Sequence, residues 1–231
     1  MGQKARPIGL RIGIVENWRS RWFAGKKDFG NYLVEDQKLR KFLTENYRFA
    51  AIAMVEIERT RGETTVILHT ARPGIIIGRK GQEVDRMKAR LEEIARDPVN
   101  IKIQEISQPE LSAQLIAESI RDQLEKRASF RRTVKRAIET IMDNGAQGAK
   151  VRLAGRIGGS DMARVETQSA GKIPLGTFRA KIDYGFTEAA TTYGNIGIKT
   201  WIYIGEVLED KKELRHVVDA EAGEIPQESK G

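Results

Sequence analysis

This sequence of 231 residues contains no cysteine and only two histidines. The absence of thiols excludes disulfide bonds, thiolate nucleophiles and zinc ribbons, and it is typical of proteins from a reducing compartment. His69 falls in a segment with the pattern of a strand and His216 falls near the C-terminus, so neither belongs to a metal-binding motif. We therefore predict no metal site, no cofactor and no catalytic residues, and we expect that the protein is not an enzyme.

Long apolar runs are also missing. A helix that crosses a membrane needs about 18 or more consecutive apolar residues, and no run approaches that length. Residues 1–7 lack the apolar stretch of a secretory signal. The Gly-x-x-x-x-Gly-Lys-Ser/Thr pattern of nucleotide-binding loops does not occur either, which excludes a P-loop enzyme. We expect a cytoplasmic protein with no membrane partner.

Charge of both signs is abundant but unevenly distributed. The chain has 40 Lys and Arg against 32 Asp and Glu. Residues 206–231 hold eight of the acids and four of the bases, so residues 1–205 hold 36 bases and 24 acids. A body this basic favours a polyanion, because each phosphate that it neutralises releases condensed counterions. The alternative is a soluble basic protein with no such partner.

Residues 1–35 form a basic arm in which glycines interrupt any long periodicity. Trp18, Trp22 and Phe23 are interleaved there with arginine and lysine. Aromatic rings beside guanidinium groups can stack on unpaired bases, and they can equally cover the core of the next domain. The sequence leaves both possibilities open.

Residues 36–108 have the pattern of a compact α+β domain. Val55 and Ile57 alternate with glutamates, as in a strand that is half exposed to water. Apolar residues at helical spacing, with turn residues between the segments, predict the order α-β-β-α-α-β. The predicted elements are helix 36–46, strands 51–59 and 64–71, a short helix opened by Pro73, helix 82–96 and strand 99–106.

Residues 109–128 are predicted to form a linker helix, and residues 129–206 a second α+β domain with a mixed or antiparallel sheet. Its first helix, 129–144, would end at Gly145. Glycine-rich turns separate short strands expected near 149–155, 163–169, 177–185 and 196–206. Residues 207–231 form an acidic tail with a composition typical of disorder.

The first candidate site is the loop Gly78-Arg79-Lys80-Gly81. Of four Gly-x-x-Gly patterns in the chain, only this one lies between a one-turn helix and a long amphipathic helix, with two cations between the glycines. Glycines let the backbone approach a sugar-phosphate chain, and the amides at the start of a helix favour anionic oxygens. In KH domains such a loop clamps about four nucleotides. An ordinary turn between two helices is the alternative.

The second candidate is a cationic helix face within residues 126–136, where six of eleven residues are basic and none is acidic. Arg131 and Lys135 are four residues apart, as are Arg132 and Arg136, so they share one face. Like charges at this spacing repel by about a few tenths of a kcal/mol per pair, a cost that phosphates would offset. The alternative is a solvated face of a basic protein.

The third candidate is a set of cations on predicted strands. Lys150 and Arg152 alternate with apolar residues within one predicted strand, and Arg156 comes directly after it. Arg179 and Lys181 lie on the polar side of another strand. They could contact phosphates on a sheet face, or they could simply face solvent. The residues alone do not decide between these possibilities.

Together these motifs resemble those of a known family, bacterial small-subunit ribosomal protein three, the KH-containing protein of the subunit head. No single stretch is specific, but the combination is. The matching stretches are Gly2-Gln-Lys-x-x-Pro7, Gly13-Ile-Val with Trp18-x-Ser-x-Trp-Phe23, His69-Thr-Ala-Arg-Pro-Gly-Ile-Ile-Ile-Gly-Arg-Lys-Gly81, Phe130-Arg-Arg-x-x-Lys-Arg136, Gly155-Arg-Ile-Gly-Gly159, Ile173-Pro-Leu with Arg179-Ala-x-Ile-Asp-Tyr184, and Thr192-Tyr-Gly-x-Ile-Gly-x-Lys-x-Trp-Ile202.

The resemblance implies a type II KH domain and a structural role in the small ribosomal subunit, with binding of ribosomal RNA in the lower head and contacts to neighbouring head proteins. It also implies a position at the tunnel through which messenger RNA enters, where a basic helix holds the messenger and helps to unwind it. The matching positions are Arg131, Arg132 and Lys135, to which we add Arg136. Other candidate contacts to ribosomal RNA are Lys4, Arg6, Arg11, Arg19, Arg21, Lys150, Arg152, Arg156, Arg179 and Lys181.

A free KH protein, acting as an RNA chaperone or ribosome assembly factor, is the alternative to a ribosomal subunit. The basic arm argues against it, because a soluble factor has little reason to carry an unstructured basic extension. A basic nuclease is a third possibility, but it would need a metal or general base that the sequence does not contain.

Overall fold

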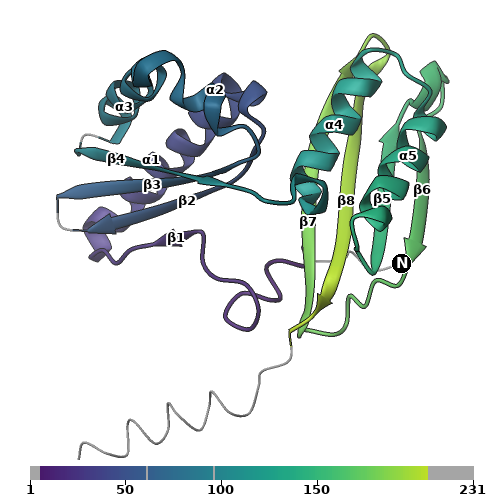
Figure 1. The fold of residues 1–231 in the computed structure, drawn as a ribbon, viewed down its shortest axis with the longest axis horizontal. Coiled ribbons are helices and arrows are strands. Elements are labelled where there is room, and N and C mark those ends of the chain that lie inside the picture. The colour runs from purple at the N-terminus through teal and green to yellow at the C-terminus, as the bar shows by residue number, and fades with distance from the viewer. Residues whose placement is uncertain (1–5, 61, 96, 208–231) are drawn as a thin grey trace, which may run out of the picture.

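The structure, a computed structural model, describes residues 6–60, 62–95 and 97–207. Two domains stand side by side, each built on one four-stranded sheet (Figure 1). The chain passes between them twice, once before β1 (Ser20–Arg21) and once after β4 (Val99–Glu105). Within the described ranges, none of the helices has the length and apolar character needed to cross a membrane.

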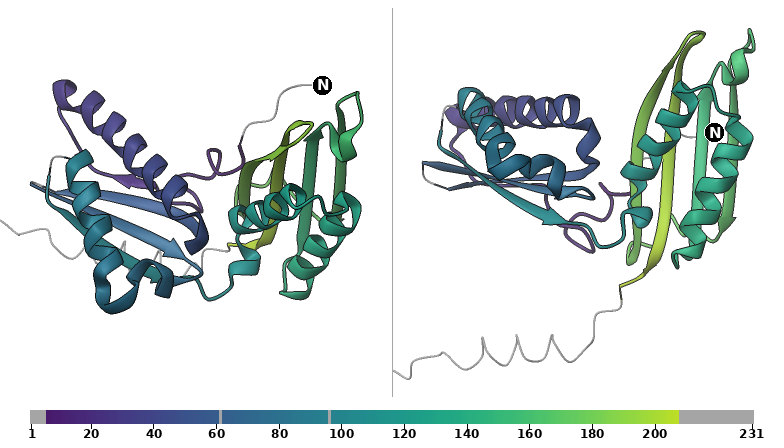
Figure 2. Two further views of the ribbon diagram at one scale, coloured as in Figure 1. Left: turned by 90° about the horizontal axis from the view of Figure 1, so that it is seen from above. Right: turned by 45° about the horizontal axis from the view of Figure 1, so that its top comes forward.

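From α1 to β4 the first domain has the order of helices and strands predicted from the sequence. Its sheet, of order β1-β2-β3-β4, also includes the two-residue strand β1, which was not predicted. Strands β2 and β3 are antiparallel, whereas β3 and β4 are parallel, as are β1 and β2. The helices cover one face of the sheet (Figure 2). The bounds are α1 Lys26–Asn46, β2 Ile52–Thr60, β3 Glu63–Thr70, α2 Pro73–Ile77, α3 Gln82–Ala95 and 3-10 turns at Arg48–Ala50 and Arg79–Gly81.

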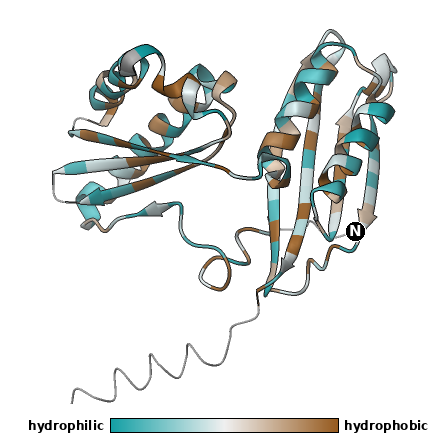
Figure 3. Ribbon diagram, viewed as in Figure 1, coloured by the Kyte–Doolittle hydropathy of each residue, from teal (hydrophilic) through white to brown (hydrophobic). Residues whose placement is uncertain are grey.

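Strand alternation and helical spacing explain why these segments pack together. In β3, Val66 and Leu68 are fully buried, while the residues between them are partly exposed. Helix α3 buries Met87 and Leu91, one turn apart on one face. Figure 3 shows the same alternation as bands of hydrophobic and hydrophilic residues along the strands. All four side chains belong to one core cluster.

The second domain has an antiparallel sheet of order β6-β5-β8-β7, with two helices on one face (Figures 1 and 2). The predicted fold class, a KH-like unit joined to a second α+β domain, is therefore confirmed, and the sheet is the antiparallel of the two alternatives. The bounds are α4 Ala113–Glu125, α5 Phe130–Asp143, β5 Gly148–Gly155, β6 Arg164–Gly171, β7 Ala180–Thr191, β8 Gly194–Glu206 and 3-10 turns at Pro109–Leu111 and Ile157–Gly159.

Helix α4 belongs to the second domain, whereas the sequence predicted a linker helix at 109–128. Its buried residues Ile116, Ile120 and Leu124 join the core of the second sheet. Asp183 of β7 accepts a hydrogen bond from the backbone N–H of Ala113 at 2.7 Å. The segment from the end of β4 to the start of α4 is therefore one of the two connections between the domains. Burial of each Ile or Leu here stabilises the second domain by roughly 1.5–3 kcal/mol.

Helix α1 begins at Lys26, ten residues before the predicted start at residue 36, so the irregular arm is shorter than predicted. The first turns of α1 are largely exposed and contain Gly30, and they therefore lack the apolar periodicity of a packed helix. Trp22 packs against this part of the helix, with ring centroids 5.3 Å from Phe29 and 5.8 Å from Tyr32. Trp22 thus covers protein surface rather than projecting freely.

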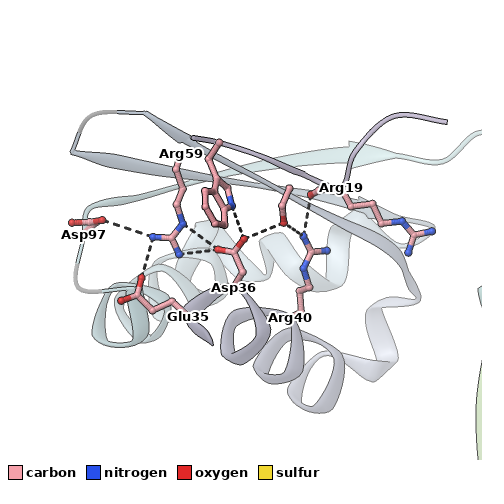
Figure 4. A network of polar contacts seen from close by, with 8 residues as sticks. Arg19, Glu35, Asp36, Arg40, Arg59 and Asp97 are labelled. Carbon is pink, nitrogen blue, oxygen red and sulfur yellow. Dashed lines mark hydrogen bonds and ion pairs between the residues drawn. The ribbon is translucent and has the colours of Figure 1, made fainter. Parts of the chain in front are cut away.

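A buried carboxylate fixes the N-terminal segment to the first domain (Figure 4). Asp36 on α1 is 3% exposed. Its Oδ1 accepts hydrogen bonds from Nε and Nη2 of Arg59, at 3.1 and 2.8 Å. Its Oδ2 accepts from Ser20 Oγ at 3.0 Å and from Trp22 Nε1 at 2.8 Å. Because a buried charge must be paired and hydrogen-bonded, this network holds β1 against the edge of β2.

Candidate nucleic-acid interface

The loop Gly78-Arg79-Lys80-Gly81 connects α2 to α3 in a conformation that requires its glycines. Gly78 has φ 66° and ψ −167°, and Gly81 has φ 80°. A Cβ on Gly78 would lie 2.6 Å from Cγ of Glu83, so no other residue fits there without movement. Arg79 is exposed, and the side chain of Lys80 lies outside what the structure describes. The backbone of the loop is thus free of Cβ atoms at both ends.

Apolar side chains flank this loop, and they were not among the candidates predicted from the sequence. Helix α2 buries Ile76 but leaves Ile75 45% and Ile77 43% exposed. Three consecutive isoleucines on a one-turn helix cannot all face the core, and this is the signal in the sequence that could have revealed them. Apolar groups beside a phosphate-binding loop offer contacts to the faces of bases.

The predicted cationic face is present on α5. Arg131, Arg132, Lys135 and Arg136 are all exposed, while Val134, Ile138 and Ile141 on the opposite side are buried. Only Lys135 among these four cations has an acidic partner in the described part of the chain, Glu139 at 3.8 Å. An exposed pair at that distance contributes little, so the face remains strongly positive.

Arg164, which the sequence analysis missed, extends this face onto β6. Its guanidinium lies 5.6 Å from the centroid of the Phe130 ring, and that of Arg131 lies at the same distance. Two cations therefore contact the Phe130 ring at the start of α5, one from the helix and one from the neighbouring strand. Arg164 could not be found from the sequence, because only the packing of α5 against β6 brings it near Arg131.

The other predicted cations of the second domain lie in four places. Lys150 and Arg152 lie on the sheet face opposite α4 and α5. Arg156 donates to Asp161 at 3.2 Å, and Arg179 donates to Glu206 at 2.8 Å, so their charge is partly neutralised. Lys181 faces a cavity of about 590 Å³ between the two domains. The structure brings together only the first two.

Arg11, predicted as an RNA contact, is fully buried. Its Nε donates to the carbonyl of Ala180 at 2.7 Å, and Nη1 donates to that of Pro7 at 3.0 Å. Its Nη2 donates to three further carbonyls of the loop before β7, the shortest to Thr177 at 2.9 Å. This placement is incompatible with a phosphate contact by the side chain, and we remove Arg11 from the candidate set.

The other arm candidates differ in availability. Arg6 and Arg19 are exposed. Arg21 is bonded to the glutamates of β2, with 2.7 Å from its Nη2 to both Glu56 Oε2 and Glu58 Oε1. Lys4 and the tail from residue 208 lie outside the described residues. Among the described residues, no group of three or more His, Asp and Glu could hold a metal ion.

The fold and these exposed cations define a class of protein: an RNA-binding KH domain followed by a second, basic α+β domain. A family model described as "KH domain" matches residues 38–111, and one described as "Ribosomal protein S3, C-terminal domain" matches residues 120–202. The small ribosomal subunit protein uS3 of Rhodopirellula baltica is 51% identical and covers 100% of this chain and 98% of the relative. That of Thermodesulfovibrio yellowstonii is 53% identical, over 90% of this chain and 95% of the relative.

The chain belongs to the uS3 family of small ribosomal subunit proteins. The resemblance on which the sequence analysis relied is thereby confirmed, as is the KH domain. The second family match begins within α4, which agrees with the assignment of that helix to the second domain.

Proposed function

We propose that this chain is a structural, RNA-binding component of the small ribosomal subunit that also contacts messenger RNA where it enters. One observation supports the proposal most strongly: four exposed cations share one face of α5, and only one of them is paired within the described residues. The ribosome itself supplies the force that moves messenger, so this role needs no chemical step by the chain.

Binding to ribosomal RNA in the lower head is the first part of the proposal. It is supported by the glycine-rich loop, by the exposed Arg6 and Arg19, and by Lys150 and Arg152. These cations come from both domains, so the protein would join RNA segments rather than bind one short site. The neighbouring proteins of the subunit head are the proposed protein partners, and the cytoplasmic ribosome is the proposed location.

Contact with messenger RNA is the second part, and we assign it to Arg131, Arg132, Lys135 and Arg136. A face of unneutralised cations binds phosphates without regard to sequence, as a surface must that meets every messenger. Arg164 lies beside the Phe130 ring at the start of α5, near Arg131, and would extend the contact onto β6.

The test is to replace Arg131, Arg132 and Lys135 with alanine and to follow two quantities. Incorporation into small subunits is measured by sedimentation, and the rate of translation is measured through a stable messenger hairpin and through an unstructured messenger. We expect normal incorporation and a selective slowing at the hairpin. The control replaces Lys38, Lys41 and Lys88, which are exposed on α1 and α3, with alanine and should leave both quantities unchanged.

Equal slowing on both messengers would refute the assignment to α5. Wild-type protein that stayed at the top of the gradient, away from small subunits, would refute the proposal as a whole. Such a result would favour the free RNA chaperone or assembly factor instead.

A further inference from the structure

The sheet of the second domain has one face covered by helices and one that no described helix covers (Figure 2). Along β8, Ile198, Thr200 and Ile202 are buried beneath the helices. Lys199 and Trp201 alternate with them and therefore point to the opposite side. On a sheet with one covered face, a strand usually presents small polar residues to water. Trp201 is partly buried there, because it packs against a small core at one end of this side, and the rest of its surface meets solvent.

The strand register collects more aromatic and cationic residues on this side. Trp201 lies opposite Lys150 of β5 and opposite Tyr184 of β7. Lys199, two residues earlier, lies opposite Arg152 and Phe186 in the same way. We call this group the open face; it consists of Lys150, Arg152, Tyr184, Phe186, Lys199 and Trp201.

Within the open face, two of the three cations lie over aromatic rings. The Nζ of Lys150 is 5.6 Å from the centroid of Trp201, and the Nζ of Lys199 is 5.8 Å from that of Phe186. Tyr184 and Trp201 are 5.4 Å apart at an interplanar angle of 55°. Phe186 is 37% exposed, although it is a large apolar residue. Gly197 lies beside its ring and adds no side chain there.

The described residues cover one end of this side of the sheet. Ala180, Ile182 and Tyr203 form a small core with Ile173 and Leu175 of the preceding loop, and Trp201 packs against it. Arg11 closes the same end through its bond to Ala180. Trp201 therefore lies where this cover stops, partly buried against the small core, and the exposed Phe186 lies beyond it.

The charge of the open face identifies its partner. Lys150, Arg152 and Lys199 are cationic, and the hydroxyls of Thr167 and Ser169 continue the surface onto β6. One acid, Glu188, lies on the same side at the far end of β7. Flat apolar rings surrounded by cations suit a polyanion that also has flat apolar groups. Single-stranded RNA has both, whereas a protein neighbour would be expected to meet this face with acidic side chains.

We propose that the open face binds unpaired bases of RNA, with Trp201, Tyr184 and Phe186 stacking on bases and Lys150, Arg152 and Lys199 contacting the phosphates between them. This inference rests on the proposed function and deepens it, since it assigns to one surface the binding of single-stranded rather than helical RNA. Stacking on aromatic rings tolerates any base, so little sequence preference follows.

The experiment measures binding of the full-length protein to an unstructured oligouridylate and to the same oligomer with abasic sugars throughout. Phe186→Leu and Trp201→Leu are each expected to weaken binding to the oligouridylate by about five- to fiftyfold. Neither should alter binding to the abasic oligomer, which has phosphates but no bases to stack. Phe49→Leu, at an 82% exposed site in the first domain, is the matched control and should alter neither.

Salt dependence separates the two kinds of contact. Replacing Lys150, Arg152 and Lys199 with alanine should lower the slope of log affinity against log salt by about two, at about 0.7 per phosphate on a single strand. The aromatic variants should leave the slope unchanged. If Trp201→Leu fails to fold, as judged by circular dichroism, the exposed Phe186→Leu decides the matter.

Equal affinity of Phe186→Leu and wild type for oligouridylate would overturn the proposal. So would an equal loss of affinity for the abasic oligomer. Either result, combined with normal entry of the wild type into small subunits, would leave the proposed function intact and refute only the open face. A variant that binds oligouridylate normally but enters subunits poorly would mean that a protein covers this face, which also overturns the proposal.

Discussion

Glu118 on α4 is a partly buried carboxyl group at the boundary between the domains. Burial raises the pKa of its carboxyl above the ordinary value. A hydrogen bond from Gln114 Nε2 at 2.9 Å and the charge of Arg121 lower the pKa, but they are smaller effects than the loss of solvent. The carboxylate is therefore less stable in the folded protein than in the unfolded chain.

The pH dependence of stability follows from that direction. At pH 7 the folded state holds a poorly solvated charge, whereas below the ordinary carboxyl pKa of 4.5 both states are protonated. We expect Glu118→Gln to raise the free energy of unfolding at pH 7, with the gain disappearing as the pH falls below about 4.5. Urea unfolding at pH 7 and pH 4 measures this, with the exposed Glu45→Gln as control. A variant that is less stable than wild type at pH 7 would contradict the argument.

At the scale of elements, the loop between α2 and α3 combines an exposed backbone with positive charge. Its two glycines adopt positive φ and expose the backbone, while Arg79 projects into solvent. The first turn of α3 contains the acids Glu83 and Asp85, and Glu83 is bonded to Arg86 at 2.7 Å. Attraction for phosphate at this site must therefore come from the loop itself rather than from the side chains of the helix.

Changing Arg79 and Lys80 to Asp should accordingly weaken binding to a fragment of small-subunit ribosomal RNA. The slope of log affinity against log salt is expected to fall by about two, at about one per lost phosphate contact. Changing the exposed Lys38 and Lys41 of α1 to Asp introduces the same charge elsewhere on the first domain and serves as control. An unchanged slope in the loop variant would mean that the loop does not touch phosphate.

The elements with strong periodicity were predictable from the sequence, and those defined by distant partners were not. Helices α3 and α5 differ from prediction by about one residue at each end, because their apolar stripes and terminal glycines are local signals. The stripe on α4 is equally clear, but it does not say which sheet the helix covers. Its partner Asp183 lies 70 residues further along the chain.

The candidate sites follow the same division. The cations on α5 could be predicted because residues four apart share a helix face whatever the fold. Arg164 could not, because only the packing of α5 against β6 places it beside Phe130. Of the open face, Lys150 and Arg152 were candidates from the sequence, but Lys199 and the aromatic rings join them only through the register of β5, β8 and β7. Arg11 shows the reverse error: a positive charge in a basic arm suggested RNA, but the buried guanidinium donates to backbone carbonyls instead.

At the scale of the whole molecule, Arg11 fixes the N-terminal segment to the second domain. The chain crosses between them at two places, at residues 106–112 and again between Arg11 and β1. The second crossing is anchored at both ends, by the carbonyls around Arg11 in one domain and by the Asp36 network in the other (Figure 4). A single connection permits rotation about itself, whereas two separated connections restrict it.

Replacing Arg11 with Met should release one of these anchors. Each buried carbonyl left without a donor costs about 1–3 kcal/mol, so the free energy of unfolding should fall by roughly 2–5 kcal/mol. More specifically, the orientation of the two domains should become variable while each domain remains folded. Because the chain has no cysteine, Lys88→Cys on α3 and Asp143→Cys on α5 allow two spin labels to be placed without interference.

The distribution of distances between the two labels should then be broader in the Arg11→Met protein than in the otherwise identical parent. Arg136→Met, which removes an exposed cation from α5, loses the same charge and should leave the distribution as narrow as in the parent. A narrow distribution in the Arg11→Met protein would mean that the 106–112 connection alone orients the domains. A broad one would show that the N-terminal segment keeps the loop of the first domain and the basic helix of the second at a constant spacing, as the proposed binding to one RNA assembly through both would require.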